Sequence, residues 1–160
     1  MNKEQVIKSL CALHRDAGER TALASAFLEK FNAKGLSPDI AGVIEFFTKE
    51  VVRHFKKENI LFEALKKKGG FSVDVAAALD ESIRGHDVLI REFWHLEEIA
   101  EKINNGSEEL MYGFIKDCTR VIGVLTAHAQ VEDEILFPEL TTRLSDADFR
   151  SLERALSLII

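Results

Sequence analysis

The sequence predicts an all-α protein, an up-down-up-down four-helix bundle with a short fifth helix at its C-terminal end. Apolar residues recur at positions i, i+3, i+4 and i+7 through long segments, which is the period of an amphipathic helix. Only a few clusters of Gly, Pro, Asn and Ser interrupt these segments. The alternation of β-branched and polar residues that marks a half-buried strand is missing. Long helices with short connections pack as antiparallel neighbours, which gives the bundle.

The helices follow in order from four turn signals. These are GLSP at 35–38, GGFS at 69–72, NNGS at 104–107 and a sequence similar to a capping box at 145–148. The basic run 66–68 falls at a predicted helix C-terminus, where cations complement the helix dipole. The sequence therefore predicts helices at 3–33, 39–68, 73–104, 107–141 and 146–159. The fifth helix is expected to place its apolar residues against the bundle, namely Phe149, Leu152, Leu156 and Ile159.

Composition and charge limit the kind of protein. A chain with 46% hydrophobic and 30% charged residues can bury one full core, so we expect a single domain over residues 1–160. The net charge of −6 argues against nucleic acid or an anionic membrane surface as the main partner. No run of about 18 apolar residues predicts a membrane span, and the N-terminus lacks a signal-like apolar stretch, so a cytoplasmic protein is expected. The apolar end LSLII is expected to pack on the bundle or on a second subunit, which leaves a homodimer or another protein partner open.

The histidines carry the functional signal. Counted from the predicted turns near residues 36 and 106, His14, His54, His86 and His128 lie at one depth within about 6 Å, one on each long helix. The fifth, His95, is nine residues after His86 and about 180° round the same helix, so we expect it at the surface.

Two glutamates share the faces of these histidines. Glu58 and Glu132 each follow a histidine by four residues, about 40° round the helix, within stripes of core residues. A single pair of this kind is often a hydrogen-bonded core residue or a surface pairing. Six such groups at one level instead favour a metal site, because buried charge is costly unless it is paired or coordinates a metal. Imidazole and carboxylate ligands without thiolate favour iron or manganese, with zinc possible, and two bridging carboxylates predict two ions about 3.5–4 Å apart.

A doubled stretch leaves one ligand open. HFKKENILFEAL (54–65) returns as HAQVEDEILFPEL (128–140), with one extra residue before the shared ILF. When the two copies are aligned on their histidines, Glu132 corresponds to Glu58. When they are aligned on ILF, Asp133 corresponds to Glu58 instead. Four residues turn about 40° and five about 140°, so geometry favours Glu132 and keeps Asp133 as the alternative.

Three small residues have less specific interpretations. Cys11 and Cys118 are expected about 20 Å apart along the bundle, too far for a disulfide, as small buried residues in a reducing compartment. Gly18 lies one turn from His14 on the same face. It marks either a path for a small ligand or close helix packing.

The order His14, His54-x-x-x-Glu58, Gly85-His86-Asp87 and His128-x-x-x-Glu132, then Leu136-Phe137-Pro138, resembles the hemerythrin-like HHE cation-binding family over the four long helices. The resemblance implies a non-haem di-iron site bridged by an oxo or hydroxo group. His14 and His54 would hold one iron, His86 and His128 the other, and Glu58 and Glu132 would bridge them. The oxygen carriers of the family have a fifth histidine, where this chain has Ile90, and a His-x-x-x-x-Asp spacing. Four nitrogens, four carboxylate oxygens and the bridge would leave about two of twelve iron positions open.

The resemblance implies a protein that binds O₂ or NO at open iron positions, for sensing, scavenging or storage. The alternative is a di-iron enzyme or an iron-homeostasis protein, acting in peroxide or NO detoxification, iron-centre repair or iron sensing, so enzymatic activity stays open. The repair proteins carry a short Cys-containing N-terminal domain, whereas this chain begins in its first helix. A ferritin-like oxidase is disfavoured because the chain has one Glu-x-x-His match, Glu92 to His95, on the wrong face. A bundle that only mediates interactions is the third possibility.

Overall fold

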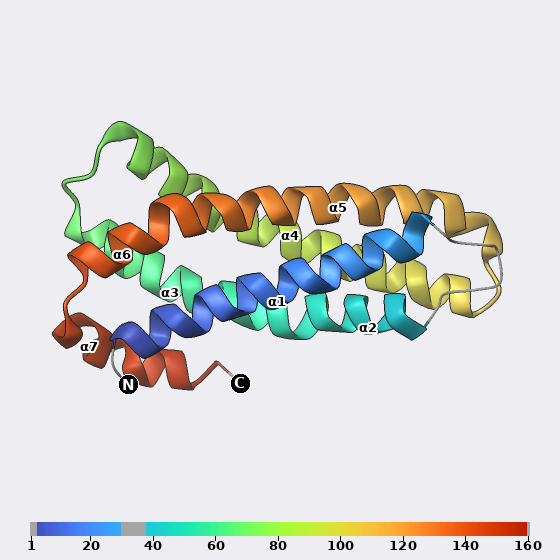
Figure 1. Cartoon of the computed structure of the whole chain (residues 1–160). Coiled ribbons are helices and arrows are strands. Elements are labelled where there is room, and N and C mark those ends of the chain that lie inside the picture. The colour runs from blue at the N-terminus through green and yellow to red at the C-terminus, as the bar shows by residue number, and fades with distance from the viewer. Residues whose placement is uncertain (1–2, 30–37, 160) are drawn as a thin grey trace.

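The computed structural model describes residues 3–29 and 38–159, and these residues form helices and no strands. Four antiparallel helical rods make the predicted up-down-up-down bundle, and a fifth helix packs at one end, beside the start of α1 (Figure 1). The elements in chain order are α1 (Lys3–Glu29), α2 (Pro38–Phe46), η1 (Phe47–Val51), α3 (Val52–Lys68), α4 (Val73–Asn104), η2 (Glu108–Leu110), α5 (Met111–Val131), η3 (Glu132–Leu136), α6 (Phe137–Arg143) and α7 (Asp146–Ser157).

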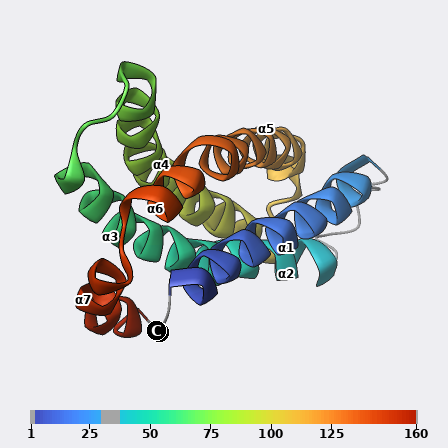
Figure 2. The same cartoon turned by 60° about the vertical axis from the view of Figure 1, so that its left-hand side comes forward.

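The predicted boundaries differ from the observed ones by a few residues. The last residues of the first predicted helix and the GLSP turn lie outside the described residues. The second rod comprises α2, η1 and α3, and the third is α4 alone, over the range that the sequence predicts. The fourth rod runs on to Arg143 instead of ending at 141, and α7 ends at Ser157 instead of 159. In the turned view of Figure 2, the N-terminal part of α4 points away from α6.

Two rods contain a π-helical turn next to their histidine and glutamate. In the second rod this turn is η1, just before His54, and in the fourth rod it is η3, which begins at Glu132. A π turn holds one residue more than an α turn, and such turns are frequent at functional sites. The extra residue of the doubled stretch falls inside η3. Beyond it, Leu136 and Phe137 are buried as Leu61 and Phe62 are, so the π turn restores the register of the apolar face.

The core consists of two apolar clusters separated by a polar layer. One cluster includes Phe47, Phe55 and Phe93, and the other includes Leu61, Phe62 and Phe137. The change from one cluster to the other occurs in every rod at the level of its histidine. The polar layer is therefore part of the interior of the bundle.

α7 is fixed to the bundle by its cap and by its apolar face. Ser145 accepts a hydrogen bond from the backbone N–H of Asp148, whose carboxylate accepts one from the backbone N–H of Ser145, so the predicted capping box is present. Asp148 also lies 2.8 Å from the Lys68 ammonium, and these contacts hold the pKa of the Asp148 carboxyl well below its ordinary value. Phe149 and Leu156 are buried in the second apolar cluster. No helix in the described part of the chain is long and apolar enough to cross a membrane.

The cap predicts a measurable contribution to stability. Ser145→Ala removes the acceptor for the Asp148 N–H, and we expect the free energy of unfolding in urea to fall by about 1 kcal/mol. Ser157→Ala is the matched control, because that hydroxyl only donates to the Arg154 carbonyl within the last turn of α7. The control should stay within about 0.5 kcal/mol of the parent protein. Equal losses from both substitutions would contradict a capping role for Ser145.

Candidate metal centre

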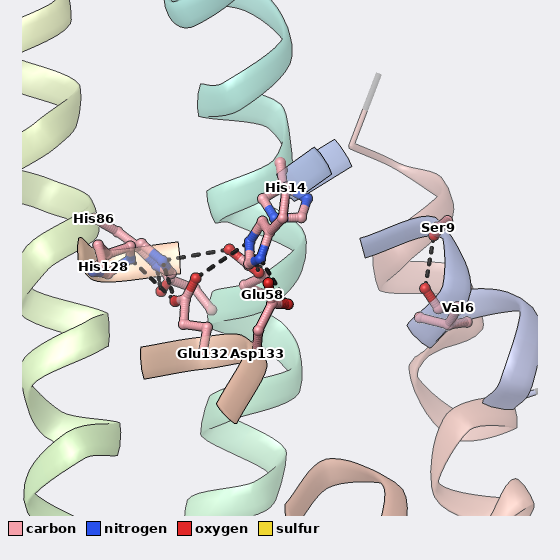
Figure 3. Close-up of polar contacts among 10 residues, drawn as sticks. Val6, Ser9, His14, Glu58, His86, His128, Glu132 and Asp133 are labelled. Carbon is pink, nitrogen blue, oxygen red and sulfur yellow. Dashed lines mark hydrogen bonds and ion pairs between the residues drawn. The ribbon is translucent and has the colours of Figure 1, made fainter. Parts of the chain in front are cut away.

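All four rods contribute to one buried polar cluster at the level where the apolar core divides. Figure 3 shows His14 from α1, Glu58 from α3, His86 from α4, and His128 with Glu132 from the fourth rod converging on one volume. His86 and both glutamates are fully buried, and His54 is nearly so. The potential ligand atoms form two groups, each within 4.8 Å, which we call the first triad (His14, His54, Glu58) and the second triad (His86, His128, Glu132).

Each carboxylate faces both triads. Glu58 Oε1 lies 2.8 Å from His54 Nε2 and 3.3 Å from His14 Nε2, while its Oε2 lies 3.4 Å from His86 Nε2 of the second triad. Glu132 mirrors this arrangement. Its Oε1 lies 3.1 Å from His128 Nε2 and 3.0 Å from His86 Nε2, and its Oε2 lies 3.4 Å from His14 Nε2. One oxygen toward each triad is the arrangement of a bridging carboxylate, so the two triads suggest a binuclear metal site.

Several of these atoms lack the hydrogen bonds that burial requires. Among the described residues, the Nε2 atoms of His54 and His128, both oxygens of Glu58 and Oε2 of Glu132 have no hydrogen-bond partner of acceptable geometry. An unsatisfied buried polar group costs about 1–3 kcal/mol, and more when it is charged. Imidazole nitrogens and carboxylate oxygens that converge without other partners are the donor set for a divalent or trivalent cation. The residues present therefore fit two metal ions.

The electrostatics keep the carboxylates ionised. Burial raises the pKa of Glu132, but the imidazoles of His128, His14 and His86 outweigh it and hold the pKa well below its ordinary value. Burial and the Glu132 carboxylate raise the pKa of Glu58, but His54 and His14 outweigh them and lower it. Burial lowers the pKa of His14, but the nearby Glu132 and Glu58 carboxylates outweigh it and raise this pKa to about 10. The cluster thus presents two anionic carboxylates to whatever cation occupies its centre.

Aromatic rings fix the orientation of two histidines. Phe55 stacks on His86 with ring centroids 4.2 Å apart, and Phe62 adds a second stacked contact to His86 at 6.0 Å. Phe137 stacks on His14 at 5.1 Å. These phenylalanines belong to the apolar clusters on the two sides of the polar layer, so core packing and ligand geometry are coupled.

Two polar residues that were not predicted in these roles contact the outer nitrogens of histidines. Asn59 Oδ1 lies 2.6 Å from His86 Nδ1, and Asp133 Oδ1 lies 3.0 Å from His14 Nδ1. Asp133 was expected only as an alternative to Glu132. The structure places Glu132 between the triads and Asp133 beside them, half-exposed, which favours the alignment of the doubled stretch on histidine. His95 is exposed, as predicted.

A cavity of about 350 Å³ lies beside the cluster, between α1 and α5. His14, His54 and His128 line it together with Gly18 and Cys11. A Cβ atom added to Gly18 would meet nothing within 4 Å, so this glycine does not mark close helix packing. The cavity therefore connects the cluster to the face of α1 on which Gly18 lies.

The cysteines are both free thiols, as predicted, but the expected burial of Cys11 is wrong. Cys11 is about 100° round α1 from Leu10, which faces the core, and this rotation turns it toward solvent. Cys118 is buried as expected, and burial raises the pKa of its thiol to about 12. Neither thiol belongs to a triad.

Comparison with known proteins gives one match. Residues 5–140 match the family model of the hemerythrin HHE cation-binding domain, which spans all four rods and both triads. Comparison with curated proteins and with solved structures found no match.

The His128 ring lies so close to Gly85 that a side chain at this position would press on it, and this contact yields a prediction. A Cβ at this position would lie 3.0 Å from His128 Nδ1 and 3.1 Å from Cε1, so Gly85→Ala must displace the ring by a few tenths of an ångström. We expect this variant to bind one of two metal ions about 10-fold more weakly in titrations of the apoprotein. Gly123→Ala is the matched control, because nothing lies within 4 Å of its added Cβ. If both variants keep the parent affinity, the position of His128 does not depend on Gly85.

Proposed function

The chain belongs to the hemerythrin HHE cation-binding family, and we propose that it holds two iron ions and binds O₂ or NO at their open positions, for sensing, scavenging or storage. The observation that carries this proposal is the arrangement of Glu58 and Glu132, each with one oxygen directed at each triad, while three of their four oxygens lack the hydrogen bond that burial calls for.

The first iron would be held by His14 and His54, and the second by His86 and His128, with Glu58 and Glu132 shared between them. Iron suits this mixture of imidazole and carboxylate; manganese suits it too, and zinc remains possible. When bound, iron supplies a redox-active centre with affinity for diatomic ligands. An oxo or hydroxo bridge would bring the ligand count to about ten of twelve positions. Ile90 packs against the first apolar cluster and offers no further ligand atom.

The surroundings of the triads support ligand access through the cavity between α1 and α5. This cavity reaches His14 and His54 of the first triad and His128 of the second, and Ala17, Val51 and Leu125 give it apolar walls. Of the four histidines, only His86 is fully buried and covered by Phe55 and Phe62. An apolar passage admits a small uncharged molecule more readily than an ion, because an ion would have to shed its hydration.

Iron sensing is a second candidate function, and the composition of the polar layer favours it. Six ionisable side chains replace a turn of apolar packing in the middle of the bundle. Without metal, the unsatisfied carboxylate and imidazole atoms destabilise the fold, and metal binding adds its free energy to folding. The stability of such a bundle would therefore change with the concentration of available iron.

Anaerobic reconstitution with Fe²⁺ tests the central proposal. We expect about two irons per chain, loss of iron in His86→Ala, and full occupancy in His95→Ala, whose side chain is exposed away from the cluster. Optical spectra of the reduced protein, recorded with O₂ and then with NO, should change and return when the gas is removed. Irreversible oxidation with consumption of peroxide would favour an enzyme instead. A purified, reconstituted protein without iron would refute the proposal.

The cavity makes a separate prediction about access. A Cβ at position 18 would have no heavy atom within 4 Å, so the cavity has room for the start of a side chain there, and Gly18→Leu narrows the passage beside His14. We expect slower association of O₂ or NO, measured by stopped flow, at unchanged iron content. Gly113→Leu is the control, since Gly113 is exposed on α5 with nothing near its added Cβ and does not line the cavity. Equal association rates in the two variants would show that the ligand enters elsewhere.

A further inference from the structure

We propose that Asn59 and Asp133 are matched positioning residues, one in each copy of the doubled stretch, that hold His86 and His14 in place for the metal ions. Asn59 follows Glu58 and Asp133 follows Glu132, so each is the fifth residue after the histidine of its copy. The inference rests on the proposed binuclear site and assigns a function to the residues just outside it.

The need for these residues follows from how the ligands are distributed over the rods. His54 and Glu58 lie on the same rod, as do His128 and Glu132, so each of these histidines has a ligand neighbour one turn away. α1 and α4 each contribute a single histidine, His14 and His86. The stacked phenylalanines limit the ring planes of these two lone imidazoles, but only a hydrogen-bond partner on another rod selects which ring nitrogen faces the cluster.

The two observed contacts supply that partner. His86 Nδ1 lies 2.6 Å from Asn59 Oδ1, and His14 Nδ1 lies 3.0 Å from Asp133 Oδ1. Because each oxygen is an acceptor, each contact selects the imidazole form with hydrogen on Nδ1 and directs Nε2 toward the cluster. The Nε2 atoms of both histidines indeed lie within 3.4 Å of carboxylate oxygens of the triads. Outer partners of this kind tune metal affinity and fix the orientation of the ligand.

The π turn η3 keeps the fourth rod in register after it has provided a ligand and a positioning residue. Glu132 is fully buried between the triads, and the next residue, Asp133, reaches His14 on α1 (Figure 3). The extra residue of η3 then brings Leu136 and Phe137 back to the apolar core. On the alignment by histidine this extra residue is Glu134, because Asp133 corresponds to Asn59, and the π turn accommodates it without shifting the core face.

The two partners differ in charge. A carboxylate makes a stronger, charge-assisted hydrogen bond and raises the basicity of the imidazole more than an amide does. Asp133 itself lines the cavity, whereas Asn59 does not. We therefore expect the two irons to be electronically distinct, the one held by His14 being the more electron-rich.

Titration of the full-length apoprotein with Fe²⁺ under argon, together with Mössbauer spectra of the loaded protein, tests this assignment. Asp133→Ala is expected to weaken one of two binding steps about 10- to 100-fold and to change the spectrum of one iron only. Asp133→Asn keeps an acceptor oxygen and should restore most of the affinity while still shifting that iron's spectrum. Glu134→Ala is the matched control, because this neighbouring carboxylate lines the same cavity but accepts its hydrogen bond from Gln130. Asn59→Ala should weaken the other step, with rescue by Asn59→Asp.

The outcomes separate the inference from the proposed function. Two tightly bound irons in both the parent protein and Asp133→Ala, with identical spectra, would overturn the positioning role and leave the proposed function intact. Loss of both irons in Asp133→Ala and Asp133→Asn alike would mean that Asp133 is itself a bridging ligand. That result would also overturn the positioning role of Asp133. A parent protein that binds no iron would refute the proposed function and the inference together. Urea unfolding of each apoprotein establishes that the variants are folded, and Asp133→Asn provides the readout if Asp133→Ala does not fold.

Discussion

Burial of two ionised carboxylates in the middle of a helical bundle is the constraint on which the other features depend. An ionised carboxylate loses several kcal/mol of solvation on burial, and attraction to neighbouring groups offsets this only with good geometry. Here Glu58 and Glu132 are surrounded by four imidazoles, yet three of their four oxygens lack a satisfactory hydrogen bond. The apolar core is divided at this level in every rod, and the phenylalanines on both sides orient the histidines. Cations bound among these groups would therefore add their binding free energy to the stability of the bundle.

The same constraint accounts for the irregular turns. A regular helix advances about 100° per residue, so the one additional residue between Asp133 and the shared ILF would rotate all later apolar residues away from the core. The π turn at η3 takes up the additional residue, and Leu136 and Phe137 remain buried. In the second rod the π turn η1 lies before His54, within the first apolar cluster, and the segment after Glu58 is regular helix. Both irregularities lie where a rod passes from packing residues to the polar layer.

The helices and the common level of the histidines could be predicted because both depend only on periodicity along the chain. The rotation of about 100° per residue also predicted that Glu58 and Glu132 face the same interior volume as the histidines. The roles of Asn59 and Asp133 could not be derived in this way, since they depend on how one rod sits against another. The extra residue of the doubled stretch was a sign of the π turn. It could not be interpreted in this way because the prediction assumed a uniform α-helix, which has no place for an extra residue. The orientation of Cys11 was misjudged because its depth along the bundle, and not its rotation about α1, was considered.

The two histidines that stand alone on their rods have different surroundings. His86 is fully buried beneath Phe55 and Phe62, and its outer nitrogen contacts a neutral amide. His14 borders the cavity, and its outer nitrogen contacts a half-exposed carboxylate. His128 and Glu132 of the second triad line the same cavity, so both metal positions would be reached from it. A metal ion held by His14 would depend on α1, which supplies one ligand and one wall of the cavity. The position of α1 therefore controls both the first metal position and the access to the pair of carboxylates that the two positions share.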